Sequence, residues 1–145
     1  MKQLFRGATI ITGTGQTFSE GWLIVEDGNI EYVGPAQSED VREEFDAVVD
    51  LKGNIILPGL INTHTHAAMS LLRGYADDLP LQQWLEEKMW PMEARFTDRE
   101  VYWGSALSVV EMIKSGTTCF ADMYDHMDQV ARVVAEAGVR ACLSR

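Results

Sequence analysis

Apolar and polar residues alternate in short runs along the first part of the chain, and this pattern predicts β-strands. We expect strands over residues 4–11, 22–25, 30–33 and 47–51. Asp27-Gly28 separates the second strand from the third and is typical of a tight hairpin, because Gly and Asn tolerate the positive φ of such turns. An acidic stretch at 38–45, SEDVREEF, is predicted to be helical. Gly13 and Gly15 form a GxG, which we interpret as a turn rather than a phosphate loop because no GxGxxG and no helix follows.

The pattern changes at Ile55, where a nearly unbroken apolar run over 55–61 is typical of a strand buried on both faces. A helix predicted over 81–89 should end before Pro91, because the residue preceding a proline is disfavoured in the α conformation. Thr97 and Glu100 form a capping box that opens a second helix. The remaining elements are expected as that helix to 114, a strand at 117–121, a helix at 125–137 and a strand at 139–144.

Alternation of strand and helix in the second part indicates an α/β fold with parallel βα units. The chain stops on a strand that no helix follows. A parallel sheet of about three strands would leave faces and edges exposed, which proteins avoid. A (β/α)8 barrel needs roughly 250 residues. We therefore expect the sequence to be cut short.

Composition narrows the function. The chain is 46% hydrophobic, with 22 acidic and 12 basic residues and a net charge of −10. This charge argues against nucleic acid or an anionic membrane as partner, because phosphate groups need a basic face. The N-terminus lacks a signal-peptide pattern and no apolar run approaches ~18 residues, so a cytoplasmic location is expected. Cys119 and Cys142 lie in apolar runs and are interpreted as small buried hydrophobic residues rather than a disulfide or a CxxC site.

The strongest chemical signal is His64-Thr65-His66 after the apolar run. Residues two apart on a strand share one face, so the two imidazoles can bind the same divalent ion. The end of a barrel strand is also where such enzymes place their sites. The alternative is a pair of surface histidines beyond a strand.

The sequence around these histidines resembles the amidohydrolase superfamily. The resemblance rests on residues 57–97, LPGLINTHTHAAMSLLRGYADDLPLQQWLEEKMWPMEARFT, with EMIKSGTTCFADMY and VRACLSR further along. Within the superfamily, the match is to the branch of chlorohydrolases, guanine deaminases and 5-methylthioadenosine/S-adenosylhomocysteine deaminases, and the last group is the most similar. The resemblance covers essentially the whole chain.

This resemblance implies a protein about three times longer. Residues 1–56 would supply strands of a small, incomplete β-sandwich, and 57–145 the first three βα units of a TIM-like (β/α)8 barrel. His64 and His66 would bind one divalent metal ion, most simply zinc. The family's other ligands and its proton-shuttling glutamate belong to later strands, so the isolated chain should hold no catalytic residue, and we expect it to be inactive.

The resemblance also implies the substrate and its contacts. The family reaction is hydrolytic deamination of the adenine ring of 5-methylthioadenosine and S-adenosylhomocysteine by a metal-activated water, with release of ammonia. Glu93 corresponds to a carboxylate that binds the ribose hydroxyls, and Arg145 to an arginine that meets the substrate tail. Without the resemblance, Glu93 would be interpreted as an exposed helix-end residue and Arg145 as a terminal charge.

Other residues keep two interpretations. His126 could approach the pocket or could be a surface histidine at a helix start, and Asp122 could support a ligand or cap a loop. The segment containing Trp84, Met89 and Trp90 could cover the substrate or simply pack on the barrel. The partner is expected to be a small nucleoside, and a homo-oligomer remains open. Two other functions also remain: a guanine- or triazine-type hydrolase of the same branch, and a non-catalytic module.

Overall fold

The computed structural model describes residues 1–37 and 44–145. Of the helix predicted over 38–45, residues 38–43 lie outside the described residues, and Glu44 and Phe45 are not helical. The chain forms two compact units, Met1–Pro58 and Gly59–Arg145. Each unit is a separate structural body with its own sheet. In the described ranges, no helix is both long enough and apolar enough to cross a membrane.

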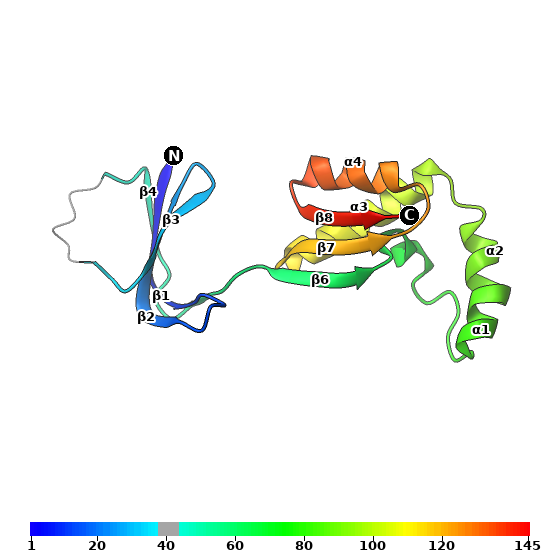
Figure 1. The fold of residues 1–145 in the computed structure, drawn as a ribbon, viewed down its shortest axis with the longest axis horizontal. Helices are drawn as coiled ribbons and strands as arrows, with labels where there is room; N and C mark the ends of the chain where they lie inside the picture. The colour runs from blue at the N-terminus through cyan, green and yellow to red at the C-terminus, as the bar shows by residue number, and fades with distance from the viewer. Residues whose placement is uncertain (38–43) are drawn as a thin grey trace. The chain divides into compact units, whose positions relative to one another are not determined.

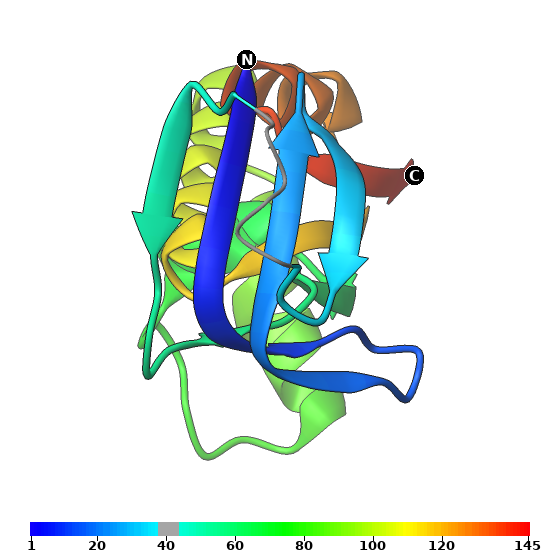
Figure 2. The same cartoon turned by 90° about the vertical axis from the view of Figure 1, so that its left-hand side faces the viewer.

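The first unit is a single mixed sheet built around its first strand (Figures 1 and 2). β1 pairs antiparallel with β2 and parallel with both β4 and β5, and β3 pairs antiparallel with β2. The strands span Lys2–Ile11 (β1), Thr17–Glu26 (β2), Asn29–Gly34 (β3), Ala47–Asp50 (β4) and Ile55–Ile56 (β5). The four predicted strands of this region are present, although β2 begins earlier than predicted.

The turns of this unit follow from their glycines. Asp27 and Gly28 both have positive φ between β2 and β3, as a type I′ hairpin requires, so the hairpin prediction is confirmed. Gly13 and Gly15, also at positive φ, lie between β1 and β2, which confirms their interpretation as turn residues.

The prediction of one strand buried on both faces over 55–61 is wrong. Ile55–Ile56 pairs with β1 in the first sheet, whereas β6, Leu60–Thr65, belongs to the second. Pro58 separates them, because a proline has no N–H to continue a strand ladder. Ile61 is 68% exposed, and β6, paired with β7 among the described residues, forms an edge of its sheet.

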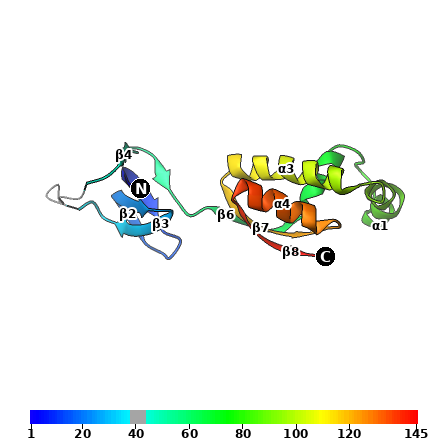
Figure 3. The ribbon, with the colours of Figure 1, turned by 90° about the horizontal axis from the view of Figure 1, so that it is seen from above.

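The second unit is a parallel sheet in the order β6-β7-β8. β7 spans Thr117–Met123 and β8 Arg140–Ser144, while α3 (Asp98–Lys114) and α4 (Met127–Ala137) connect the strands and lie side by side against one face of the sheet (Figure 3). The two strand–helix–strand predictions for this region are confirmed, apart from small shifts at the ends.

Local signals set the boundaries of these helices. Thr97 and Glu100 form the predicted capping box at the start of α3. Gly138, in the left-handed conformation, is the C-cap that ends α4, as predicted. The prediction that a helix stops before Pro91 is wrong. The run continues from α1 (Leu81–Trp84) through a π-helical segment, η2 (Leu85–Met89), into α2 (Trp90–Glu93). The wider turn, in which Trp90 N–H bonds to Leu85 O, accommodates the proline.

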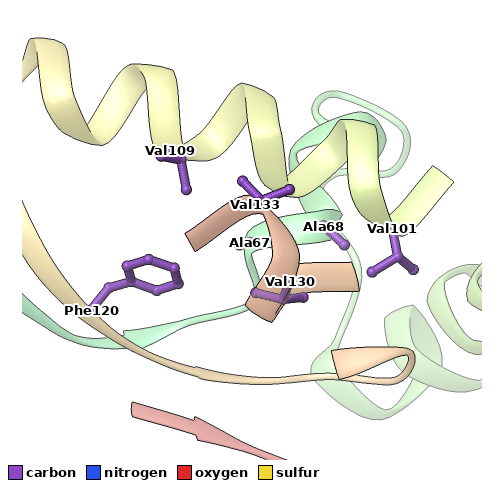
Figure 4. Close-up of a cluster of buried hydrophobic side chains, with 7 residues drawn as sticks. All are labelled: Ala67, Ala68, Val101, Val109, Phe120, Val130 and Val133. Carbon is purple, nitrogen blue, oxygen red and sulfur yellow. The ribbon is translucent and has the colours of Figure 1, made fainter. Parts of the chain in front are cut away.

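The core of this unit lies between the sheet and the helices (Figure 4). Phe120 from β7 meets Val109 of α3 and Val130 and Val133 of α4, together with Ala67, Ala68 and Val101. Cys119 alternates with Phe120 along β7 and points away from this core. Cys142 alternates in the same way with Ala141 and Leu143, which pack against the core. Both cysteines are free, as expected, but Cys119 is only half-buried and Cys142 is exposed, so the prediction that they are buried is wrong.

A 3₁₀ helix, η1 (Ala67–Leu72), packs tightly on α3 at a glycine. A Cβ added to Gly104 would lie 2.4 Å from the carbonyl oxygen of Ala68. Ser70 Oγ donates to Gly104 O, and Ser108 Oγ donates to Ala67 O, each at 2.7 Å. Gly104 is therefore the contact that lets η1, which directly follows His66, lie against α3.

Gly104→Ala should destabilise the protein, although alanine ordinarily makes a helix about 1 kcal/mol more stable than glycine does at an interior position. Here the added methyl group must separate α3 from η1, and we expect a loss of roughly 1–3 kcal/mol. The measurement is the thermal melting temperature of the full-length protein that contains this chain. Val110→Ala, at a position 53% exposed on the same helix, is the control and should change the free energy of unfolding by less than about 0.5 kcal/mol. A melting temperature raised by Gly104→Ala would contradict the close contact.

Candidate active site

Two histidines meet at the carboxyl end of β6. His64 lies within the strand and His66 directly follows it, and their ring centroids are 5.2 Å apart in an edge-to-face arrangement. The side chain of Asn62 accepts a hydrogen bond from the backbone N–H of His64 at 3.2 Å, which fixes the backbone at the strand end. The structure thus brings together the two rings that the HxH spacing predicted to share a face.

The next strand determines the orientation of His66. Its Nδ1 lies 2.7 Å from the carbonyl oxygen of Met123, at the end of β7. A carbonyl can only accept, so Nδ1 carries a proton, and in the neutral ring Nε2 is then the nitrogen with the lone pair. Metal-binding histidines are commonly held in this way, with one ring nitrogen on a backbone carbonyl and the other free for the ion.

Asp122, just before Met123, anchors the segment that follows His66. Its Oδ1 accepts a hydrogen bond from Ala67 N at 3.1 Å, and the side chain is 3% exposed. Its Oδ2 is buried without a partner among the described residues. Burial raises the pKa of Asp122, while the Ala67 N–H and the nearby His66 lower it. Ala67 is the first residue of η1, so the contact shown is the capping one of the two interpretations, and the segment that Asp122 caps directly follows His66.

A pocket of about 590 Å³ opens beside His66. It collects side chains from the end of β7, the start of α4, the α1–α2 run and the end of the chain. Its lining residues are His66, Met69, Trp84, Leu85, Trp90, Glu93, Ala94, Phe96, Val101, Met123, Tyr124, Asp125, His126 and Arg145. Glu93 and Arg145, which were selected from the sequence, therefore border the same pocket as His66.

Glu93 is held by a tyrosine that the sequence did not single out. The hydroxyl of Tyr124 donates to Glu93 Oε1 at 2.9 Å, and both side chains are half-buried. Burial, followed by the hydrogen bond to the Glu93 carboxylate, raises the pKa of Tyr124, so the hydroxyl keeps its proton and remains a donor. The ring of Tyr124 also lies 6.4 Å from that of His66, centroid to centroid.

His126 combines both of its predicted positions. It lies immediately before α4 in a left-handed conformation, with φ of 52°, and it also borders the pocket. Its Nδ1 lies 2.6 Å from Asp98 Oδ1, at the start of α3. Arg145 is exposed and borders the pocket on the same side as His126.

The aromatic segment is divided between pocket and core. Trp84 and Trp90 line the pocket, whereas Met89 is 1% exposed and packs in the interior. Trp84 Nε1 donates to Ala76 O at 3.1 Å, which holds the helix against the preceding loop. Trp84 and Trp90 thus border the pocket, whereas Met89 has the packing position of the second interpretation.

The donor set fits part of a metal centre. Within residues 1–37 and 44–145, no group of three or more His, Cys, Asp or Glu side chains is arranged to hold an ion. Two adjacent imidazoles, one with its tautomer fixed by Met123 O, do suit two positions of a divalent ion such as zinc. The remaining positions of such a centre would need ligands other than these.

Sequence comparison gives the relationship of this chain to known proteins. Residues 55–145 match the sequence profile described as "Amidohydrolase family". The chain is 55% identical over 144 residues to a 5-methylthioadenosine/S-adenosylhomocysteine deaminase from Desulforamulus reducens, with 98% of this chain and 33% of that protein aligned. It is 53% identical over 140 residues to a 5'-deoxyadenosine deaminase from Methanospirillum hungatei, covering 94% of this chain and 31% of that protein.

Structural comparison agrees. A crystal structure of an adenosine deaminase from Xanthomonas campestris with bound zinc superimposes with a TM-score of 0.89 at 34% identity, over 96% of this chain and 32% of that one. The chain thus spans about a third of the length of the relatives it matches.

Asp122→Ala should weaken metal binding without removing a ligand. Loss of the acceptor for Ala67 N–H frees the segment that carries His66, and removal of such supporting contacts typically costs 10–100-fold in affinity. The dissociation constant for zinc, measured by competition with a chelating dye in the full-length protein that contains this chain, is the readout. Asp122→Asn keeps an oxygen acceptor and should lose less, and Asp128→Ala, exposed on α4, should lose nothing. Unchanged zinc affinity in Asp122→Ala would contradict this role.

Proposed function

The chain belongs to the amidohydrolase family, and from that premise we propose that the protein containing it hydrolytically deaminates the adenine ring of 5-methylthioadenosine and S-adenosylhomocysteine. One observation carries the proposal: a histidine suited to a metal, a carboxylate and a guanidinium border a single pocket. They are His66, Glu93 and Arg145. The reaction replaces the exocyclic amino group of adenine with oxygen from water and releases ammonia.

His64 and His66 would hold the divalent ion, most simply zinc, as two of its ligands. The Nδ1–H of His66 is bound to Met123 O, so Nε2 is the nitrogen available to the ion. When bound, such an ion supplies the acidity that makes water a nucleophile near neutral pH. We expect the other ligands and the proton-transferring group to come from parts of the protein beyond this chain.

Glu93 would bind the sugar of the substrate. A carboxylate can accept both protons of a neighbouring diol, and Tyr124 occupies only one lone pair of its Oε1. Trp84 and Trp90 line the same pocket and offer apolar surface for the purine. Contacts of this kind accelerate a reaction by fixing the reacting ring against its nucleophile.

Arg145 would recognise the tail of the substrate. A guanidinium can bind a carboxylate with two parallel hydrogen bonds, and S-adenosylhomocysteine carries a carboxylate at that end. 5-Methylthioadenosine carries only a methyl group there. Arg145 should therefore discriminate between the two substrates.

Two other functions compete with this one. A guanine or triazine hydrolase would use the same histidines but would have no sugar for Glu93 to bind. A non-catalytic module would need no ion at all. Glu93, half-buried and hydrogen-bonded on the pocket wall, favours a substrate with hydroxyl groups. We propose a small-molecule nucleoside as the partner and leave the oligomeric state open.

The first experiment measures ammonia release by the full-length protein from four compounds, with the metal content of the same sample determined by mass spectrometry. We expect release from S-adenosylhomocysteine and 5-methylthioadenosine, slower release from adenosine and none from guanine, with a bound divalent ion. Removal of the ion by a chelator should abolish activity, and zinc should restore it. Activity on guanine alone would show that the proposed substrate is wrong. Absence of both a bound ion and ammonia release would contradict the proposed catalysis altogether.

Arg145→Met should lower activity on one of the two thionucleoside substrates much more than on the other. Loss of a charged, paired hydrogen bond should lower kcat/KM for S-adenosylhomocysteine by roughly 10–100-fold, while the value for 5-methylthioadenosine changes less than about threefold. Arg140→Met, an exposed change at the other end of β8 and away from the pocket, is the matched control. Equal losses on both substrates would exclude a role for Arg145 in recognising the tail.

A further inference from the structure

Tyr124 joins the two parts of the pocket that the proposed function assigns to metal and sugar. Its hydroxyl donates to Glu93 Oε1 at 2.9 Å, and its ring centroid is 6.4 Å from that of His66. The preceding residue, Met123, accepts the Nδ1–H of His66 through its backbone carbonyl. Two consecutive residues at the end of β7 therefore contact the metal-binding histidine and the sugar-binding carboxylate.

Glu93 needs such a contact because its own element does not fix it. It is the last residue of α2, a short helix reached through the π-helical segment. Helix ends fray, and a glutamate there has several accessible rotamers. Among the described residues, the hydroxyl of Tyr124 is the hydrogen-bond partner found for its carboxylate. The bond selects one orientation of that carboxylate, and Oε2 has no hydrogen-bond partner among the described residues.

We propose that Tyr124 is a positioning residue for nucleoside specificity, which holds the Glu93 carboxylate in the orientation that accepts the two ribose hydroxyls. This inference rests on the proposed function of Glu93 and goes beyond it by assigning the residue that orients the carboxylate. The hydroxyl acts through Glu93 and not on the reacting ring. Its loss should therefore affect sugar binding and leave the chemical step largely intact.

The experiment compares Tyr124→Phe with the unaltered full-length protein on two substrates, 5-methylthioadenosine and its 2',3'-dideoxy analogue. For the diol substrate we expect KM to rise about tenfold with kcat changed less than about twofold. For the dideoxy analogue, which has no hydroxyls for Glu93 to bind, both constants should change less than about twofold. The diol preference, the ratio of the two kcat/KM values, should fall accordingly.

Tyr102→Phe provides the matched control. Tyr102 also donates to a glutamate, Glu136, at 2.6 Å, but it lies on the helical layer and does not border this pocket. The substitution removes the same kind of hydrogen bond and should leave the diol preference unchanged. Melting temperatures of both variants give the structural cost of losing a tyrosine hydroxyl.

Glu93→Gln distinguishes the possible failures. If it lowers the diol preference and Tyr124→Phe does not, the positioning role of Tyr124 is wrong and the role of Glu93 stands. If neither variant changes that preference, the sugar-binding role of Glu93 fails together with the inference. Equal losses on both substrates in Tyr124→Phe would also overturn the inference, because they indicate a general structural defect. A lowered preference in both variants, with the control unchanged, supports it.

Discussion

The hydrogen bond from His66 to the Met123 carbonyl determines what the end of β6 can do. A histidine just beyond a strand has free torsions and two tautomers, and a weakly held ring would pay entropy each time it bound an ion. The backbone carbonyl of the neighbouring strand removes both freedoms. Asp122 extends the constraint by binding Ala67 N–H, so the residues on both sides of the peptide after His66 are tied to β7. The parallel pairing of β6 with β7 is what brings these ends together.

Packing behind the site serves the same constraint. Directly after His66 the chain enters η1, which lies close to α3 while the N–H of Ala67 is bound to Asp122. Gly104 permits that approach, and the hydroxyl of Ser108 donates a hydrogen bond to Ala67 O. Hence Ala67 has its N–H bound by β7 and its carbonyl bound by α3, with its methyl group in the core. The position of the segment that follows His66 is therefore determined by contacts with both β7 and α3.

Much of this architecture could be predicted from the sequence because its signals are local. The period of two in the strands, the capping box at Thr97 and the glycine after α4 each act within a few residues. The HxH spacing is local in the same sense, since strand geometry alone brings residues two apart to one face. The contact between Tyr124 and Glu93 spans 31 positions and depends on how α2 meets the end of β7, which no local pattern encodes. A tyrosine directly after a β-strand was the available signal, but alone it did not distinguish a pocket residue from a packed one.

The prediction that the helix ends before Pro91 is wrong for the same reason, because it relies on a local preference alone, and the continued helix bears on the site. Local preference predicts a break before a proline, yet the run continues because a π-helical turn replaces the α-helical hydrogen bonds around it. Each extra residue in a turn rotates everything that follows by about 100° relative to an uninterrupted α-helix. Glu93 follows that turn, so its direction depends on the π-helical segment as well as on the helix axis. If the helix had ended before Pro91, this run would not carry the Glu93 carboxylate to the hydroxyl of Tyr124. The irregular helix is thus the local feature through which a distant segment becomes part of the site, which agrees with the frequent occurrence of such π-turns at functional positions.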